Sequence, residues 1–334
     1  MSMQLRSPIR GKVFVTGASG FVGSNLRAAL LAGGADVVSL VRAVSPSSTQ
    51  GRSAAVDYAD LAGLKRLMRE ERPDYVFHVA AATKGVSYED FRLANVLPTQ
   101  NLIEALASEH PSVKRFLFVS SLTAYGPSNL GPPKRESDVP QPIEFYGQSK
   151  LEAERVVEGY GERVAWTIIR PPTVYGPAEV DAFALFKAAK NGVSLFFGNE
   201  DKQTSAIYVD DLVQAIVDAA QSDRTRGRGY FVTDGVDYTW REFQKHVTAA
   251  VGRRTLRVNL PSFLVPAASM AGELLTSIDK KPRLLNRQKA VLDAQQAWLC
   301  SADAAREDFG FRADVDIAEG TRRTHRWYVE NKWL

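Results

Sequence analysis

Near its start, the chain passes from a strand-like segment through three glycines straight into a helical pattern, VFVTGASGFVGSNL at residues 13–26. Gly17 permits a tight turn, Gly20 lets backbone N–H groups approach a pyrophosphate, and Gly23 allows a helix to pack closely on a strand. The amino terminus of the helix adds partial positive charge. This arrangement predicts a dinucleotide site. Its expected contacts are Gly17, Ser19, Gly20, Phe21, Val22 and Gly23.

Short apolar runs alternate with helical patterns through the first half of the chain. The strand-like runs are residues 12–16, 37–41, 75–79, 115–119 and 164–169, and the helical stretches are 22–32, 61–71, 91–109 and 148–158. Apolar strands separated by helices need a sheet covered on both faces, so we expect a doubly wound parallel α/β sheet of the Rossmann type. After residue 169 the pattern loosens, which predicts a smaller C-terminal substrate lobe. The expected division is a dinucleotide-binding core at 1–170 and a mainly substrate-binding lobe at 171–334, with some segments returning to the core.

Composition excludes several classes of protein. The chain has 334 residues, 42 Lys+Arg against 38 Asp+Glu, a net charge of +4, and a single cysteine, Cys300. A secreted disulfide scaffold and a zinc site with paired cysteines are therefore excluded. Three arginines between residues 224 and 228 form a short basic loop with no aromatic platform beside it. This argues against nucleic-acid binding.

Two segments bear on where the protein resides. Residues 1–11 are polar and lack the apolar core of a signal peptide. Residues 261–278 are the most apolar later stretch, but Pro266 and Glu273 interrupt them. This favours a packed amphipathic helix over a membrane anchor. We therefore expect a cytoplasmic protein with no membrane partner.

The end of the second expected strand bears on the choice of dinucleotide. An acidic residue at this position would bind the ribose hydroxyls of NAD, but Val41 stands there and Arg42 follows. A guanidinium can neutralise a 2′-phosphate, so the sequence favours NADP over NAD. Asp57 and Tyr58 follow the next short strand, at a position suited to the adenine edge.

A tyrosine and a lysine stand four residues apart at the start of an expected helix, Tyr146 and Lys150. Residues at i and i+4 share a helix face, so the Lys150 ammonium is expected near the phenol, lowering its pKa from about 10 toward neutral. Ser120 and Ser121 end an expected parallel strand, at the carboxyl edge where ligands bind. The combination predicts proton transfer at an alcohol or ketone.

Seven motifs run in order through the chain: TGASGFVG (16–23), HVAA (78–81), Asn95, SSLTAYG (120–126), YGQSK (146–150), RPPTVYGP (170–177) and YVDDL (208–212). In this set the chain resembles the extended short-chain dehydrogenase/reductase family, the NAD(P)-dependent epimerase/dehydratase group. The resemblance covers nearly the whole chain. It implies a small-molecule substrate and a homodimer.

The resemblance also implies roles for individual residues. Tyr146 matches the catalytic acid/base, and Lys150 matches the residue that lowers its pKa and holds the nicotinamide ribose. Ser121 matches the hydroxyl that polarises the substrate oxygen, with Thr123 as a spare hydroxyl. Asn95 matches a structural asparagine near the site, although a hydrogen bond on the side of its helix explains it equally well. The cofactor contacts implied by the resemblance are Ala80, Ala81, Asn95, Tyr146, Lys150, Pro171 and Thr173.

Departures from the family pattern narrow the chemistry. Leu122 and Thr123 stand where sugar-nucleotide dehydratases carry Asp and Glu, so water elimination lacks its acid and base. The Cys and His of double epimerase–reductases are also missing, since Ala178 stands at the histidine position. Many sugar-nucleotide epimerases carry an Asn where this chain has Thr173. Many also carry an Arg in the stretch that corresponds to residues 203–205, and this chain has none there.

These features lead to one interpretation and two alternatives. The first is reversible hydride transfer at a secondary alcohol or ketone carbon, with a nucleotide-linked sugar as substrate. The alternative is an NADPH-dependent reductase or hydroxysteroid-type dehydrogenase acting on an apolar ring ketone. The second alternative is a non-catalytic dinucleotide-binding protein, because a fold alone does not establish a function.

Overall fold

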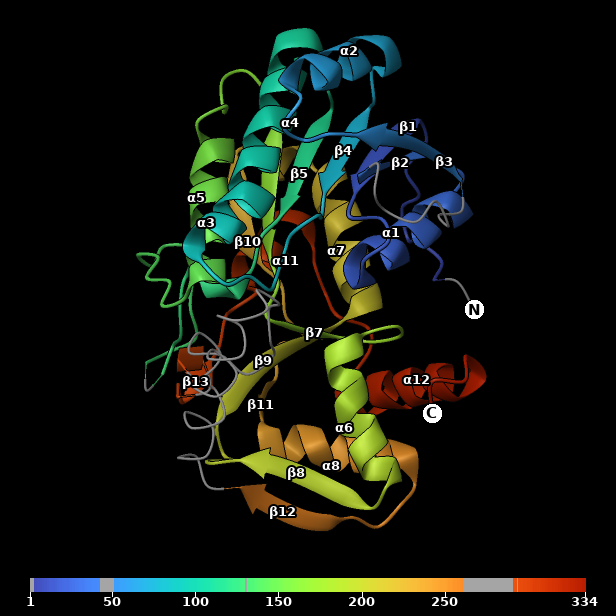
Figure 1. Ribbon diagram of the computed structural model, residues 1–334, viewed down its shortest axis with the longest axis vertical. Coiled ribbons are helices and arrows are strands. Elements are labelled where there is room, and N and C mark those ends of the chain that lie inside the picture. The colour runs from blue at the N-terminus through green and yellow to red at the C-terminus, as the bar shows by residue number, and fades with distance from the viewer. Residues whose placement is uncertain (1–2, 43–50, 130, 261–290, 293) are drawn as a thin grey trace.

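A seven-stranded, wholly parallel sheet forms the centre of the larger part of the molecule (Figure 1). The structure is a computed structural model that describes residues 3–42, 51–129, 131–260, 291–292 and 294–334. The strand order is β10-β6-β5-β4-β1-β2-β3, so the direction of winding reverses between β1 and β4. The bounds are β1 Lys12–Thr16, β2 Asp36–Arg42, β3 Arg52–Val56, β4 Tyr75–His78, β5 Arg115–Val119, β6 Trp166–Arg170 and β10 Arg228–Phe231.

Helices cover both faces of this sheet, and each face has its own apolar core. One core holds side chains of α1 (Phe21–Ala32), α7 (Val209–Gln221) and α11 (Asp303–Phe309). The other holds side chains of α2 (Leu61–Glu71), α4 (Leu97–Glu109) and α5 (Phe145–Glu158). The doubly wound sheet expected from the alternating pattern is confirmed.

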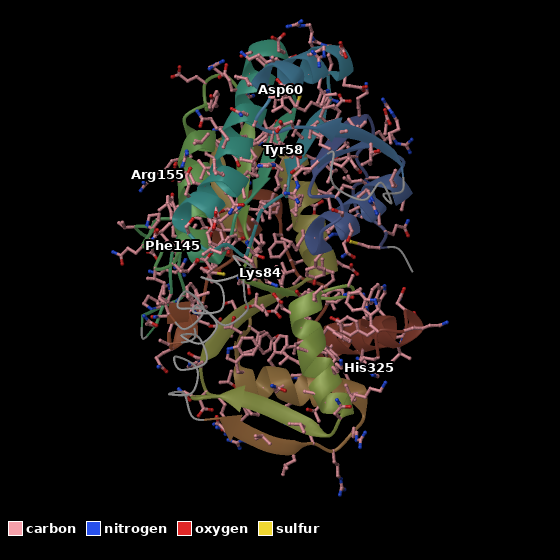
Figure 2. The ribbon with its side chains drawn as sticks, in the orientation of Figure 1. Tyr58, Asp60, Lys84, Phe145, Arg155 and His325 are labelled. Carbon is pink, nitrogen blue, oxygen red and sulfur yellow. The ribbon has the colours of Figure 1, made fainter. Side chains whose placement is uncertain are left out.

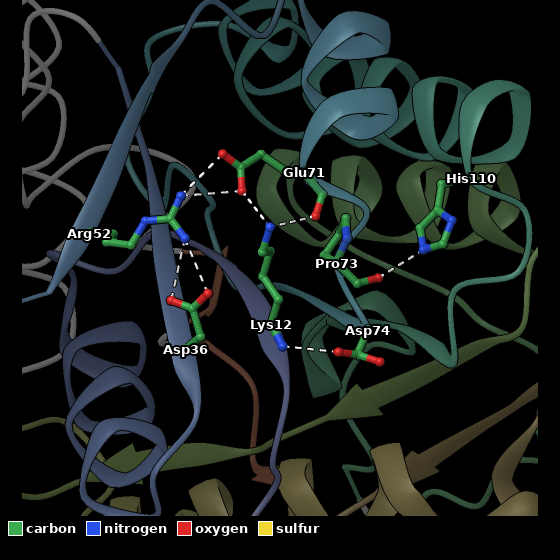
Figure 3. A network of polar contacts seen from close by, with 7 residues as sticks. All are labelled: Lys12, Asp36, Arg52, Glu71, Pro73, Asp74 and His110. Atoms are coloured by element: carbon green, nitrogen blue, oxygen red, sulfur yellow. Dashed lines mark hydrogen bonds and ion pairs between the residues drawn. The ribbon is translucent and has the colours of Figure 1, made fainter.

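A polar network joins the amino ends of three strands to the end of α2 (Figure 3). Lys12 Nζ bonds to Glu71 Oε2 at 2.7 Å, and its backbone N–H donates to Asp74 at 2.9 Å. Arg52 contacts Asp36 at 3.1 Å and Glu71 at 3.1 Å. These contacts lie at the opposite edge of the sheet from the carboxyl ends of the strands.

A smaller lobe lies beyond the carboxyl ends of the large sheet (Figure 1). Its sheet has the order β11-β9-β13, with β7 paired to β9, and β8 pairs separately with β12. The strands are β7 Thr173–Tyr175, β8 Val193–Phe197, β9 Gln203–Tyr208, β11 Asp237–Thr239, β12 Leu256–Leu260 and β13 Ala297–Trp298. The helices that pack here are α6 Val180–Lys190, α8 Trp240–Val251 and α12 Ile317–Glu330. Between β9 and β11 the chain returns to the large sheet, where α7 packs on one face and β10 pairs with β6.

The expected helix at 91–109 is divided. It consists of α3 (Tyr88–Phe91), a π-type turn at Arg92–Val96 and then α4. Pro98 has no N–H to donate to the carbonyl of residue 94 and its ring crowds that carbonyl, so the chain widens before α4. The widened turn places Asn95 in the interior, where its side chain is 2% exposed.

The membrane expectation is tested only in part. Within the described ranges, no helix is both long and apolar enough to span a bilayer. The amphipathic helix expected at 261–278 lies outside the described residues. The same described part of the chain contains no cluster of His, Cys, Asp and Glu suited to a metal ion.

Candidate active site

The glycine turn after β1 has the geometry that its spacing predicts. Gly17 has φ +68°, and a Cβ there would lie 2.8 Å from the backbone of Ala80. A Cβ on Gly23 would collide with the carbonyl oxygen of Gly17. Gly20 differs, because a Cβ there would meet only that same oxygen, at 3.3 Å. Gly17 and Gly23 are thus needed by the fold itself, whereas Gly20 borders open space.

That open space suits an anionic group. Ser19 and Gly20 are exposed, and Phe21 and Val22 are partly buried at the start of α1. The first turn of α1 carries no acidic residue, and Gly20 provides no side-chain cap. The N–H groups of this turn and the helix dipole are therefore directed at the space beside Gly20. The residues fit a dinucleotide pyrophosphate.

The structure places the residues proposed for the adenosine end in different surroundings. Arg42 is exposed at the end of β2. Asp57 is exposed and accepts a hydrogen bond from the Ala59 N–H at 2.9 Å. Tyr58 is turned inward: its hydroxyl donates to the Leu40 carbonyl at 3.3 Å, and burial raises its pKa while the nearby Arg42 charge opposes the shift.

Three hydroxyl groups meet at the carboxyl end of β5. Ser121 precedes the short 3-10 turn Leu122–Ala124, and its Oγ accepts hydrogen bonds from the Thr123 N–H at 3.2 Å and the Thr123 hydroxyl at 3.0 Å. The Ser121 side chain also lies close enough to the Tyr146 phenol to lower the pKa of that phenol. The structure therefore brings together Ser121, Thr123 and Tyr146 from two segments of the chain.

Helix α5 starts three residues before its predicted first residue, because Glu144 caps it. The Glu144 carboxylate accepts hydrogen bonds from the backbone N–H groups of Tyr146, at 2.6 Å, and Gly147. Burial is the main cause that raises the pKa of Tyr146, the Glu144 charge raises it further, and the nearby Ser121 hydroxyl lowers it. The expectation of a lowered phenol pKa is thus wrong in this structure.

Lys150 lies one turn after Tyr146 but points into the interior. It is 1% exposed, and its Nζ donates to the Val119 carbonyl at 2.7 Å and lies 4.0 Å from the centre of the Phe118 ring. Burial lowers the pKa of Lys150 to about 7, and the Glu154 charge opposes this shift. The ammonium bonds to a carbonyl of β5, although Lys150 shares a helix face with Tyr146. The shared helix face therefore did not determine the partner of the ammonium.

A buried ion pair fastens α5 to the end of β6. Arg170 and Glu154 have side chains 4% and 1% exposed, and their closest N–O distance is 2.9 Å. Arg170 Nε also bonds to both oxygens of Glu154 at 3.1 Å, and the guanidinium lies 4.8 Å from the centre of the Tyr125 ring. Since the guanidinium and the carboxylate bond to each other and are both buried, the pair fixes the position of α5 along the sheet.

Asn95 holds the loop that follows β4. Its Oδ1 accepts from the Ala82 N–H at 2.7 Å, and its Nδ2 donates to the Ala82 carbonyl at 3.1 Å and to Ser149 Oγ at 2.9 Å. The loop thereby presents Ala80, which is partly buried, and Ala81, which is exposed. Asn95 thus ties this loop to α5.

The remaining predicted contacts lie where the chain leaves β6. Pro171 is buried. Thr173, at the start of β7, shares a hydrogen bond with the Thr204 hydroxyl of β9 at 2.9 Å. Between the lobes, Lys84 pairs with Asp181 at 3.7 Å, and Figure 2 shows Lys84 between the large sheet and the smaller lobe.

Sequence reasoning did not identify Glu144 or Glu154, and it gave no role to His78, the first residue of the HVAA motif. Glu154 follows Lys150 by four residues, which is a signal that could have been used. Glu144 stands just before the predicted helix and could have been recognised as an acidic cap. The contacts of His78 depend on three segments distant in sequence, so no local signal exists for them.

Comparison with known proteins places these features in context. The model of the NAD dependent epimerase/dehydratase family matches residues 13–232. Ceramide reductase of Caulobacter vibrioides is 27% identical over 331 residues, covering 97% of this chain and 96% of that protein. A structure of an epimerase from Methanothermobacter thermautotrophicus has a TM-score of 0.80 and 25% identity, covering 97% of this chain and 94% of the other.

A further relative matches a shorter region more strongly. It is a dTDP-6-deoxy-L-talose 4-dehydrogenase (NAD(P)(+)) of Kitasatospora kifunensis, 36% identical over 172 residues. That match spans 50% of this chain and 54% of the relative, about half of each.

Proposed function

Because this chain belongs to the NAD dependent epimerase/dehydratase family, we propose that it moves a hydride reversibly between NAD(P) and a secondary alcohol or ketone carbon. The observation that carries this proposal is the proximity of the Ser121 hydroxyl, which bonds to Thr123, to the Tyr146 phenol at the carboxyl edge of the sheet. The glycine turn opens at that same edge, since it follows the parallel strand β1.

The roles follow from the surroundings of the hydroxyl groups. The bound dinucleotide supplies or accepts the hydride. Ser121 orients the substrate oxygen, and Tyr146 gives or takes its proton. Since burial raises the pKa of Tyr146, the phenol is protonated at neutral pH and is ready to donate in the reductive direction. Thr123 holds Ser121 in place through two hydrogen bonds.

For the substrate, we propose a nucleotide-linked sugar. The support is the match, over half of this chain, to a relative named dTDP-6-deoxy-L-talose 4-dehydrogenase (NAD(P)(+)). We assign the residues up to 170 to dinucleotide binding and residues 171–334 mainly to the substrate, with α7 and β10 returning to the large sheet. NADP as the preferred dinucleotide and a homodimer remain our proposals.

A second candidate is a reductase of an apolar ketone. One observation favours it: Thr173 and Thr204 bond to each other in the region where many sugar-nucleotide epimerases carry an Asn and an Arg. The match to ceramide reductase over nearly the full length of both chains also supports a reductase.

The test replaces the phenol and leaves the ring. Tyr146→Phe should lower turnover by about a hundredfold or more while the affinity for the dinucleotide stays close to wild type. The matched control is Tyr160→Phe, at the other end of α5, where the hydroxyl bonds to Glu104. Unchanged turnover in Tyr146→Phe would remove this residue from the mechanism. Dinucleotide binding without turnover on either substrate class would favour the non-catalytic alternative.

A further inference from the structure

A chain of polar contacts crosses the interior at the centre of the large sheet. Thr16 ends β1, His78 ends β4, and both are 0% exposed. Thr16 Oγ1 and His78 Nδ1 are 2.8 Å apart. On the other side of the ring, His78 Nε2 lies 2.9 Å from Thr99 Oγ1 of α4. The imidazole stacks on Phe118 with ring centres 5.5 Å apart, so the ring plane is held as well.

The donors and acceptors fix the direction of this chain. Thr16 Oγ1 accepts from the N–H groups of Val79, at 3.1 Å, and Ala80, at 3.0 Å, so its own proton is left for His78 Nδ1. Thr99 gives its proton to the Asn95 carbonyl at 2.6 Å, so it can only accept from His78 Nε2. Both ends therefore require a neutral imidazole with its proton on Nε2.

The opposite tautomer would break the chain at both ends. A proton on Nδ1 would give Thr16 Oγ1 a third donor and leave the Thr16 hydroxyl proton without its acceptor, and Thr99 would face an unprotonated Nε2. Protonation of both nitrogens is opposed by burial and by the nearby Lys150 charge, which together lower the pKa of His78 to about 3. One protonation state satisfies every partner.

Beyond Thr99, the polar contacts reach the backbone of the proposed acid/base. Asn95 donates from Nδ2 to Ser149 Oγ at 2.9 Å, and the Ser149 hydroxyl donates to the Tyr146 carbonyl at 2.7 Å. The other end begins beside Gly17, whose Cα packs against Ala80. The glycine turn and the first turn of α5 are thus joined by buried hydrogen bonds with His78 in the middle.

We propose that His78, fixed as the neutral Nε2–H tautomer, is a positioning residue that couples the glycine turn to the placement of Tyr146. The inference rests on the proposed function for the meaning of that placement, since the glycine turn is where the dinucleotide would bind. His78 acts through Thr16 on one side and through Thr99 and Asn95 on the other.

The first test observes the tautomer directly. In the full-length protein with 15N-labelled histidine, the resonances of His78 are assigned by their loss in His78→Gln. We expect a protonated Nε2 and an unprotonated Nδ1, unchanged between about pH 5 and pH 9. A proton on Nδ1, or titration of the ring within that range, would overturn the inference.

The second test interrupts the chain on the side of the proposed acid/base. Thr99→Val removes the acceptor of the Nε2–H, whereas Thr99→Ser keeps it. Thr324→Val is the matched control, because Thr324 is equally buried and donates to the carbonyl four residues earlier at 2.7 Å, as Thr99 does, but belongs to α12. The probe is the Cζ resonance of Tyr146 in 13C-tyrosine-labelled protein, assigned with Tyr146→Phe and followed during titration with NAD+ and with NADP+.

In wild type, the Tyr146 resonance should shift when the dinucleotide binds. Thr99→Val should lose that shift while its dinucleotide affinity changes less than about threefold, and Thr99→Ser should restore it. Thr324→Val should behave as wild type in both measurements. A full shift in Thr99→Val overturns the coupling, as does a loss that Thr99→Ser fails to restore. Absence of dinucleotide binding to wild type would instead count against the proposed function.

Discussion

The Lys150 ammonium donates a hydrogen bond to the Val119 carbonyl oxygen at 2.7 Å, and through it α5 is anchored to the carboxyl end of β5. Val119 directly precedes the two serines that end this strand, and Lys150 lies one helical turn after Tyr146. The contact therefore sets the separation between the proposed acid/base and the proposed oxygen-binding hydroxyl. It also holds the Lys150 amino group in a buried position, with a measurable effect on stability.

Lys150→Met should change how stability depends on pH. The pKa of Lys150 falls from 10.5 to about 7 on folding, so between these values the unfolded chain holds a proton that the folded protein has released. The free energy of unfolding of wild type should therefore rise with pH in this window, relative to Lys150→Met, by up to about 1.4 kcal/mol per pH unit. Below pH 7 both states are protonated and the two curves should run parallel.

Urea unfolding at several pH values measures this difference. Lys187→Met is the control, because Lys187 is exposed on α6. Parallel curves for wild type and Lys150→Met from pH 7 to 10 would show that burial does not shift the lysine.

Gly20→Val should abolish dinucleotide binding and leave the fold intact. Gly20 has φ −80°, which any residue adopts, and its Cβ position borders open space. The branched side chain would fill the region that a pyrophosphate would enter. Calorimetric titration with NAD+ and NADP+ checks this, with Gly131→Val as a control, since a Cβ there also meets a single backbone oxygen, at 3.1 Å. Wild-type affinity in folded Gly20→Val would locate the cofactor elsewhere.

Arg42→Ala should shift the preference from NADP(H) toward NAD(H). Arg42 is exposed at the end of β2, and the last residues of this strand, Val41 and Arg42, include no carboxylate to repel a 2′-phosphate. Loss of a charge-assisted contact of about 1.5–3 kcal/mol should weaken NADP(H) by about ten- to a hundredfold and leave NAD(H) nearly unchanged. Titrations of wild type, Arg42→Ala and the exposed-site control Arg66→Ala measure the effect. Equal weakening of both dinucleotides, or a wild-type preference for NAD(H), contradicts the assignment.

Ala178→Gly should stabilise the protein. Ala178 has φ +69°, a left-handed conformation that an L side chain adopts only at a cost of about 1–2 kcal/mol. Glycine removes that cost but adds freedom to the unfolded chain, so the net gain should be about 0.5–1 kcal/mol. Thermal and urea unfolding measure it. Ala184→Gly, in the exposed part of α6, should do the opposite and lose about 1 kcal/mol; if both variants lose stability alike, the strain at Ala178 is refuted.

The large sheet could be predicted from the sequence because its signals are local. The runs at 12–16 and 115–119 and the helix at 61–71 match β1, β5 and α2 residue for residue. The helix at 91–109 could not be predicted as it stands, since the π-type turn before Pro98 alters the periodicity on which the prediction depends.

The sequence predicts the residues of the candidate site but not their contacts. The glycine spacing and the order of the motifs select Gly20, Ser121 and Tyr146, and their roles stay predictions. The partner of Lys150 was not predictable, because helix spacing fixes a direction, whereas the acceptor at Val119 is brought there by the sheet. The pKa of Tyr146 was mispredicted for the same reason, since burial and the Glu144 charge arise only in the folded molecule.

The network of Lys12, Arg52 and Glu71 closes the edge of the sheet that faces away from the site (Figure 3). The strands between the two edges are about 13–23 Å long, beyond the distance over which exposed charges act in physiological salt. A change of an exposed charge at one edge therefore has little electrostatic effect at the other edge. Over evolutionary time, substitutions at the amino ends of the strands can change the stability of the protein while selection on its chemistry acts separately at the carboxyl ends.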